Sequence, residues 1–427
     1  MSHSVKAGKS SKTLRRSFLR RWYRWVLASA LLIGGIVGVP WWNERPLREA
    51  DRLLAADDAK ACLQLVDSYL KTDPKNSRAI ALKARALVSL GDAIGAIRLI
   101  DQVGAATPEE MHAYAKACLI LERWTTALGI LEHLVSLTPD DADLLHELSA
   151  CSAKVGRYER AIQAASMFAD TPGNQARGYA LIGMLERDRG NNQKCCDAWK
   201  TVVELQPNAA GLQIEPHEFF LEYGKALLLI GDARGAEELL ERSVMHQETA
   251  DALAYLGKAK MQLGKAAEAE SCWSSAVGKD SDSRVAREGL AELAMQQAQF
   301  AKALGWLKPL QAQSELKSST AFLLQRTYTL LKDTDNAAKW KLEVDRLRKL
   351  EEMRVNMEQV IVNSPESMWA QAFQSYFLAE QGNHGQAAAM LAPFMKEDSP
   401  EFLQLLWKSL KDGSPLPALD QVPMELF

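Results

Sequence analysis

The sequence lacks the short motifs that most often carry enzyme chemistry. Neither His146-Glu147 nor His217-Glu218 is followed by the second histidine of an H-E-x-x-H zinc site. No G-x-S-x-G nucleophile elbow is present, and Gly8-Lys9-Ser10 lacks the glycine that opens a phosphate-binding loop. The seven histidines are scattered, and we expect them at surface or groove positions. We therefore predict a protein that is not an enzyme, with no catalytic residue, no cofactor, no metal site and no small-molecule substrate.

Cysteine pairs with metal or redox spacing are absent as well. The six cysteines form no C-x-x-C pair and no zinc spacing. Most of them fall at small or apolar positions of the helical pattern described below, so we expect buried free thiols that pack as small hydrophobic side chains. Adjacent residues on a helix point about 100° apart, which disfavours a redox pair at Cys195-Cys196. The six are Cys62, Cys118, Cys151, Cys195, Cys196 and Cys272.

Segments typical of β-strands are nearly absent, whereas the helix formers Ala, Leu, Glu, Lys and Gln are abundant. The net charge of −3 hides an asymmetry, because the first 24 residues carry eight basic residues and no acid. The rest of the chain then holds 43 basic against 54 acidic residues, a net charge of −11. An acidic body argues against nucleic acid as a partner.

Residues 25–42 read WVLASALLIGGIVGVPWW and contain no charge. This length is just enough to cross a hydrocarbon core of about 30 Å, and tryptophans lie at both ends as in interfacial aromatic belts. The basic residues 1–24 predict a cytoplasmic N-terminus. We expect a single-pass protein of the inner (cytoplasmic) membrane with its remaining bulk on the extracytoplasmic, periplasmic side.

Two alternatives concern the export of this segment. A cleaved signal peptide is disfavoured, because no A-x-A-like site follows the apolar run and residues 39–41 read VPW. Residues 15–20 read RRSFLR and resemble the twin-arginine export motif, although Leu14 stands where that motif has Ser or Thr. We favour an uncleaved signal anchor and leave open whether export follows the general or the twin-arginine route.

Beyond the apolar segment the sequence resembles itself at a spacing near 34 residues. Three positions recur in each repeat: a small residue, a turn glycine, and a second small residue. The first position is occupied by Ser149, Gly183, Gly224, Gly257 and Ala291, in steps of 34, 41, 33 and 34 residues. The turn glycines are Gly91, Gly156, Gly190, Gly231, Gly264 and Gly382, and the later small residues are Ala96, Ala127, Ala161, Cys195, Ala236, Ala269, Ala303 and Ala387. The long step coincides with an insertion, AAGLQIEP, between Asn208 and His217.

This spacing fits pairs of antiparallel helices that approach at the small residues and turn at a left-handed glycine. One hairpin cannot bury its apolar face alone, so the hairpins stack. The pattern resembles the tetratricopeptide repeat (TPR): Leu256-Gly257 matches its L-G, and Ala269 with Trp273 matches its A-x₃-aromatic pair. The resemblance implies an all-α fold, a right-handed superhelix (α-solenoid) of TPR helical hairpins, here preceded by one transmembrane helix.

The domain organisation follows from these features. Residues 1–24 form a basic cytoplasmic tail, residues 25–42 a transmembrane signal anchor, and residues 43–395 a TPR array of about nine to ten units. One helix near 337–362 should be unusually long, because no breaker precedes Asn363-Ser364-Pro365. Residues 396–427 should hold a capping helix, EFLQLLWKSLKD, and an extended tail.

The resemblance also implies a concave groove lined by exposed positions of each first helix. The candidate residues for this groove are basic or apolar, and a surface of this kind suits an amphipathic helix or an extended peptide with acidic groups. We predict a non-catalytic, membrane-anchored scaffold for protein–protein interaction. The alternative is an assembly or quality-control factor for envelope, secretion or cytochrome complexes. The candidate groove residues are Arg177, Met184, Arg187, Leu221, Lys225, Leu228, Lys258 and Met261.

Overall fold

A computed structural model describes residues 44–312, 316–396, 398–423 and 426. These residues form α-helices and short 3-10 helices with no β-strand among them, so the prediction of an all-α fold is confirmed. The predicted basic tail and signal anchor, residues 1–42, lie outside the described residues. Within the part that is described, no helix combines the length and the apolar character needed to cross a membrane.

The chain divides into two compact units, Met1–Leu134 and Val135–Phe427, which we call unit 1 and unit 2. In unit 1, each helix from α2 to α5 packs against the next one in the chain. The helices of unit 1 are α2 (Arg45–Ala55), α3 (Ala59–Leu70), α4 (Ser77–Ser89), α5 (Ala93–Val103), α6 (Pro108–Ile120) and the first part of α7 (Trp124–Leu137).

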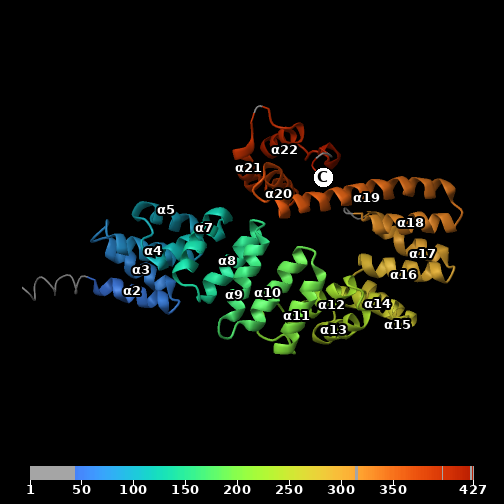
Figure 1. Ribbon diagram of the computed structural model, residues 1–427, viewed down its shortest axis with the longest axis horizontal. Coiled ribbons are helices and arrows are strands. Elements are labelled where there is room, and N and C mark those ends of the chain that lie inside the picture. Colours follow the sequence, from blue (N-terminus) through green and yellow to red (C-terminus); the bar gives the residue numbers. More distant parts are fainter. Residues whose placement is uncertain (1–43, 313–315, 397, 424–425, 427) are drawn as a thin grey trace, which may run out of the picture. The chain divides into compact units, whose positions relative to one another are not determined.

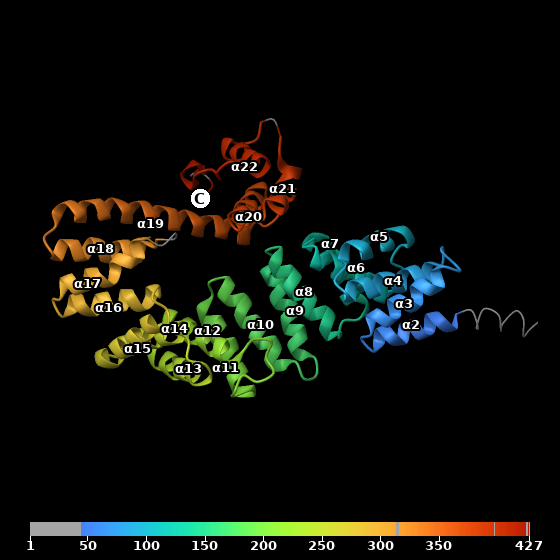
Figure 2. The same ribbon diagram turned by 180° about the vertical axis from the view of Figure 1, so that it is seen from behind.

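Unit 2 continues the same arrangement, and its hairpins follow one another in chain order (Figures 1 and 2). Its hairpins are α8 (Ala142–Lys154) with α9 (Tyr158–Asp170), α10 (Gln175–Asp188) with α11 (Asn192–Leu205), α12 (Pro216–Leu229) with α13 (Ala233–His246), α14 (Ala250–Gln262) with α15 (Ala266–Lys279), and α16 (Arg284–Gln296) with α17 (Phe300–Leu307). They are followed by η1 (Lys308–Ala312), α18 (Ser318–Leu330), α19 (Thr334–Asn363), α20 (Met368–Glu380), α21 (His384–Leu391), η2 (Ala392–Phe394), α22 (Glu401–Asp412) and η3 (Leu419–Gln421).

The curvature of unit 2 can be read from the packing between hairpins. Three pairs of successive first helices pack against each other, α12 with α14, α14 with α16 and α16 with α18. Among the described hairpins, no pair of successive second helices packs as closely. Elements on the inner side of a curved stack lie closer together than those on the outer side. The first helices therefore line the concave side of this part of unit 2.

The turns between paired helices repeat one conformation. All six predicted turn glycines have φ between 77° and 85°, a left-handed conformation that costs glycine no steric strain. After the turn, an N–H bonds back to a carbonyl five residues earlier, as Lys265 does to Lys260 at 2.9 Å, which satisfies the end of the first helix. Glu122, Ala298 and Lys332 adopt the same conformation without being glycine.

The small residues pack where the pattern predicted. All eight residues of the second small position, including Cys195 and Ala269, are completely buried. A Cβ added to Gly183 would lie 2.2 Å from Nε1 of Trp199, and one added to Gly257 would lie 2.5 Å from Nε1 of Trp273. Each indole sits across the glycine and donates to a first-helix carbonyl, at 3.1 Å for Trp199 and 3.0 Å for Trp273. The indole fills the space that the glycine leaves.

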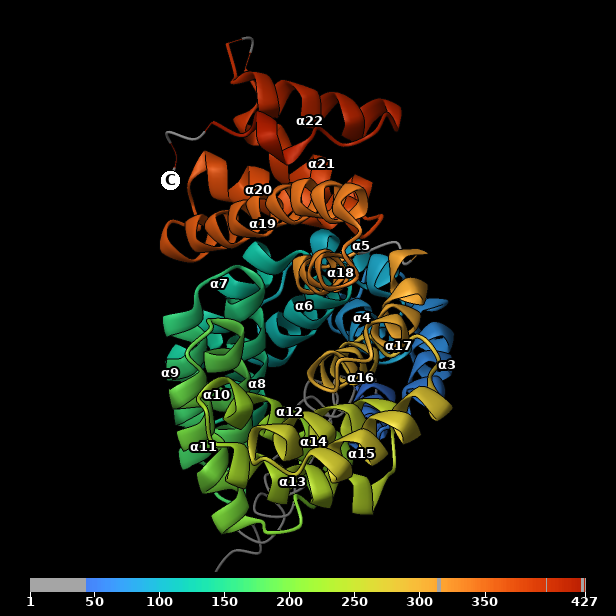
Figure 3. The same ribbon diagram turned by 90° about the vertical axis from the view of Figure 1, so that its right-hand side faces the viewer.

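Helix α19 is 30 residues long, about twice the length of the other helices of unit 2. Its C-terminal half carries the buried Met353 and Met357, which join a core formed with α20, α21 and α22. Figure 3 shows these last helices gathered against α19. The segment after α19 also meets the turn between α8 and α9, where Arg157 pairs with Glu366 at 2.7 Å. The first and the last hairpins of unit 2 therefore touch.

Candidate functional site

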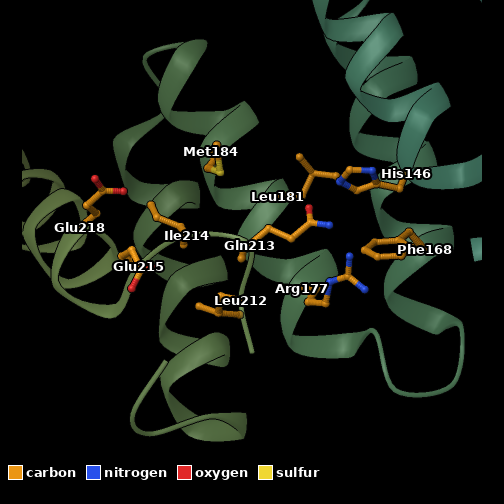
Figure 4. Close-up of a pocket in the computed structure, with 11 residues that line it drawn as sticks. His146, Phe168, Arg177, Leu181, Met184, Leu212, Gln213, Ile214, Glu215 and Glu218 are labelled. Atoms are coloured by element: carbon orange, nitrogen blue, oxygen red, sulfur yellow. The ribbon is translucent and has the colours of Figure 1, made fainter. Parts of the chain in front are cut away.

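A pocket of about 620 Å³ opens in unit 2 between α8, α10 and α12. Its apolar part includes Ala180, Leu181 and Met184 of α10 and the ring of Phe168, which reaches in from α9. Figure 4 shows His146, Phe168 and Arg177 at one end and Glu215 and Glu218 at the other. This volume lies within the range of typical ligand sites, about 300–1,000 Å³.

The insertion between α11 and α12 builds one wall of the pocket. Ala209, with φ of 53°, is 1% exposed and anchors the insertion in the core around Trp199 and Phe219. Leu212 and Ile214 pack on the same core and also line the pocket. The first helices α10 and α12 lack the close contact that joins α12 to α14, and so do α8 and α10. The insertion lines the space between α10 and α12.

The basic end of the pocket carries charge that no acid neutralises. Arg177 donates to Oδ1 of Asn174 at 2.8 Å, and its guanidinium lies 5.3 Å from the centre of the Phe168 ring. The His146 ring lies 5.4 Å from that of Phe168. Among the described residues, no carboxylate lies within ion-pair distance of Arg177. Figure 4 shows the amide of Gln213 directed toward this end.

Farther along the first helices, cations and anions alternate and pair with each other. Arg187 of α10 pairs with Glu222 of α12 at 3.0 Å, and Lys225 pairs with the same carboxylate at 2.8 Å. The Lys225 ammonium also lies 4.8 Å from the ring centre of Tyr255 on α14. This part of the face is therefore largely neutralised within the protein, unlike the pocket.

Helices α14, α16 and α18 continue the alternation with Lys258, Glu292 and Arg326. Burial raises the pKa of the Glu292 carboxyl, and Glu288 raises it further, whereas Arg326 and Lys258 lower it. The Glu292 side chain is nevertheless exposed. A concave surface can explain both observations. Surrounding protein atoms displace water from the carboxylate, which raises its pKa, but they do not cover the group.

The structure distributes the predicted groove residues unevenly. Arg177 and Met184 line the pocket, and Arg187 and Lys225 form the ion pairs described above. Lys258 is exposed on α14, and Met261 packs partly buried against the core around Trp273. The role of these residues in binding stays a prediction.

For two of those residues the predicted exposure in the groove is wrong. Leu221 and Leu228 were expected to face the groove, but each is only 8% exposed and belongs to the core with Trp199 and Leu240. Leu221, Lys225 and Leu228 have the spacing of residues on one face of a helix. The side chains of Leu221 and Leu228 nevertheless pack into the core between neighbouring helices and do not face the groove. The apolar surface of the pocket comes instead from Leu181, Met184 and the insertion.

Sequence reasoning missed Phe168, Leu212, Gln213 and Ile214. Phe168 is on a second helix, whereas the candidate groove residues were taken only from first helices, and it is 2% exposed. The other three belong to the insertion, whose only signal was the long step of 41 residues in the repeat. An insertion in an otherwise regular solenoid alters the surface of one face at that repeat. The step of 41 residues could therefore have indicated an altered surface there.

The thiols are buried, as predicted, except that Cys272 is half-buried, and all six are free. Burial raises the pKa of Cys195 to about 12 and those of Cys62 and Cys196 to about 11. Thiols with such pKa values are protonated at neutral pH and react poorly as nucleophiles. Within the described residues, no group of three or more His, Cys, Asp or Glu side chains is placed to hold a metal ion.

The repeated hairpins, left-handed turns and small-residue contacts define an α-solenoid of tetratricopeptide type. No protein-family model matches the chain, and no curated protein matches it. Similar solved structures include the C-terminal part of a TPR repeat-containing protein from Cytophaga hutchinsonii, at 15% identity over 57% of this chain and 99% of that one, with a TM-score of 0.47. MamA from Desulfovibrio magneticus matches at 17% identity over 40% of this chain and 97% of that one, with a TM-score of 0.35.

PilF of Pseudomonas aeruginosa matches at 15% identity over 55% of this chain and 97% of that one, with a TM-score of 0.39. Matches this distant carry no argument about what the chain binds. The description of the fold as tetratricopeptide-like rests on the geometry of the repeats themselves.

Proposed function

We propose that the chain is a non-catalytic scaffold for protein–protein interaction, held at a membrane by residues 25–42. It binds a segment of a partner protein on the first-helix face of unit 2. The observation that carries this proposal is the pocket between α8, α10 and α12, where an apolar floor and an unneutralised guanidinium open to solvent. Surfaces that bind peptides combine apolar pockets with a few polar groups that orient the ligand.

The proposal predicts that partners contact the first-helix face rather than the outer one. A photo-crosslinking amino acid placed at Met184 or Lys258 in the full-length chain should yield defined adducts in cells. The matched control is Lys200, an exposed residue on the second helix α11. Adducts that form only from position 200, or equally from all three, would show that the partner binds elsewhere.

The membrane attachment and its orientation are tested separately. A reporter that is active only outside the cytoplasm, fused after Phe427, should be active when residues 1–42 are present. It should become inactive when they are deleted, because the apolar segment and the basic tail direct export. Full reporter activity without residues 1–42, or activity of a cytoplasmic reporter in the intact chain, would contradict this part of the proposal.

A further inference from the structure

The pocket of unit 2 has opposite charge at its two ends, and this inference rests on the proposed function. At one end lie Arg177 and His146, and the Gln213 amide is directed toward them (Figure 4). At the other end lie Glu215 and Glu218, at the start of α12. The floor between them is apolar and includes Leu181 and Met184 (Figure 4).

Within the described residues, neither end of the pocket forms an ion pair with another part of the protein. Among the described residues, Arg177 has only the neutral Asn174 and the Phe168 ring as partners, and no cation pairs with Glu215 or Glu218. Arg187 and Lys225, which lie farther along this face, are by contrast paired with Glu222. Charges lining a concave surface favour a ligand of complementary charge, which also fixes its register.

We infer that the pocket binds an extended partner segment in which an acidic side chain, one or two aliphatic side chains and a basic side chain follow one another. The carboxylate pairs with Arg177 and accepts from Gln213, the aliphatic groups cover Leu181 and Met184, and the cation pairs with Glu215 or Glu218. The tail of the chain itself is a poor candidate, because Leu426 already packs into the core around Phe402. A uniformly acidic segment is also a poor ligand, because Glu215 and Glu218 at the other end of the pocket would repel it.

The experiment is selection of a displayed random-peptide library on the immobilised full-length chain. Selected peptides should carry an acidic and a basic residue on either side of one or two aliphatic residues. Their affinity should fall by roughly tenfold or more in Arg177→Glu, because a desolvated ion pair is replaced by repulsion. Replacing the peptide acid by lysine should restore binding to Arg177→Glu. The charge-matched control, Arg98→Glu, changes an exposed residue of α5 and should bind as the unmodified chain does.

A second variant protects the test against misfolding. Gln213→Glu alters an exposed residue of the insertion that has no hydrogen bond in the described structure, so folding should be unaffected. It should weaken the same peptides by bringing a negative charge to the basic end. Peptides selected without an acid, or bound equally by both variants, would overturn the inference.

Two further outcomes separate this inference from the scaffold itself. If adducts form at Met184 and Lys258 in cells but neither variant weakens the selected peptides, the scaffold stands and the charge assignment falls. If Arg177→Glu abolishes self-association of the chain in sedimentation, the occupant is a second copy and the inference is wrong. Failure of both the peptides and the adducts would remove the proposed function as well.

Discussion

At the scale of single residues, the fold depends on where a side chain is missing. Gly183, Gly224 and Gly257 leave the space that Trp199, Leu240 and Trp273 fill, each sixteen residues later in the chain. These contacts are closer than any Cβ could tolerate. Five of the six turn glycines instead have nothing within 4 Å of an added Cβ, and at the sixth, Gly156, the nearest atom lies at an ordinary contact distance of 3.4 Å. Glycine therefore has two distinct roles in this array, one steric and one conformational.

The steric role predicts that Gly257→Ala destabilises unit 2. The added methyl group would overlap the Trp273 indole, and overpacking of this kind costs about 1–3 kcal/mol. The control is Gly278→Ala in α15, where nothing lies within 4 Å of the added Cβ and the change should stabilise by up to about 1 kcal/mol. Urea unfolding measures both variants. Equal effects at the two positions would contradict the steric explanation.

The conformational role predicts opposite effects at two equivalent turns. Ala298→Gly should stabilise the chain, since alanine at a φ of 58° is strained there, and Gly264→Ala should destabilise it, each by roughly 1 kcal/mol. Gly264 has no atom within 4 Å of an added Cβ, so steric overlap does not contribute. Urea midpoints of the two variants should move in opposite directions. A shift in the same direction would mean that local strain does not decide stability at these turns.

At the scale of helices, the first-helix face is a series of charges whose spacing follows the repeat. Glu222 joins Arg187 to Lys225, and Glu292 faces Lys258, Arg326 and the like-charged Glu288. Lys225 and Lys258 occupy equivalent positions in the sequence but differ in structure, because only Lys225 has a carboxylate partner one helical turn away. Lys258→Glu is therefore the cleaner charge reversal for binding experiments.

The raised pKa of Glu292 predicts that the stability of the folded chain depends on pH. Its pKa is raised above the ordinary value of 4.5, first by burial and then by Glu288. A carboxyl with a raised pKa in the folded state stabilises while protonated, below about pH 4.5, and loses that contribution as the pH rises through the folded-state pKa. Glu292→Gln should therefore raise the melting temperature at pH 7, and the gain should shrink toward pH 4. A gain that does not change between these pH values would exclude ionisation as its cause.

At the scale of the molecule, unit 2 brings its two ends together. The long helix α19 lets the chain return toward its first hairpin, where Pro365 lies 3.4 Å from the Cβ position of Gly156 and Glu366 pairs with Arg157. Both charged side chains are largely exposed, at 40% for Arg157 and 70% for Glu366. Exposed ion pairs contribute only about 0–1 kcal/mol, so this contact is weak.

A weak contact predicts that unit 2 can be opened without unfolding it. Arg157→Glu should leave the melting temperature nearly unchanged but broaden the distance distribution between spin labels at Lys154 and Gln381. The swapped pair, Arg157→Glu with Glu366→Arg, should narrow the distribution again, because the attraction is restored. A distribution that is unchanged in Arg157→Glu would show that apolar contacts alone hold the ends together.

The repeat itself was readable from the sequence because it depends on local chemistry. Small residues, left-handed glycines and helix formers recur at fixed spacing, and each acts within one hairpin or between adjacent ones. The register also identified Arg177 and Met184 as surface residues near a groove. Residues 25–42 stay a sequence-based prediction, because they lie outside the described residues.

The tertiary structure decided everything that depends on how far apart two hairpins lie. The insertion reads as a longer spacing, but only the fold shows that it lines a pocket beside α10 and α12 with Leu212 and Gln213. The burial of Leu221 and Leu228 and the pairing of Lys225 likewise depend on the side chains of neighbouring repeats. A sequence register states which face of its own helix a residue occupies, whereas exposure and charge pairing depend on what the next helix brings to that face.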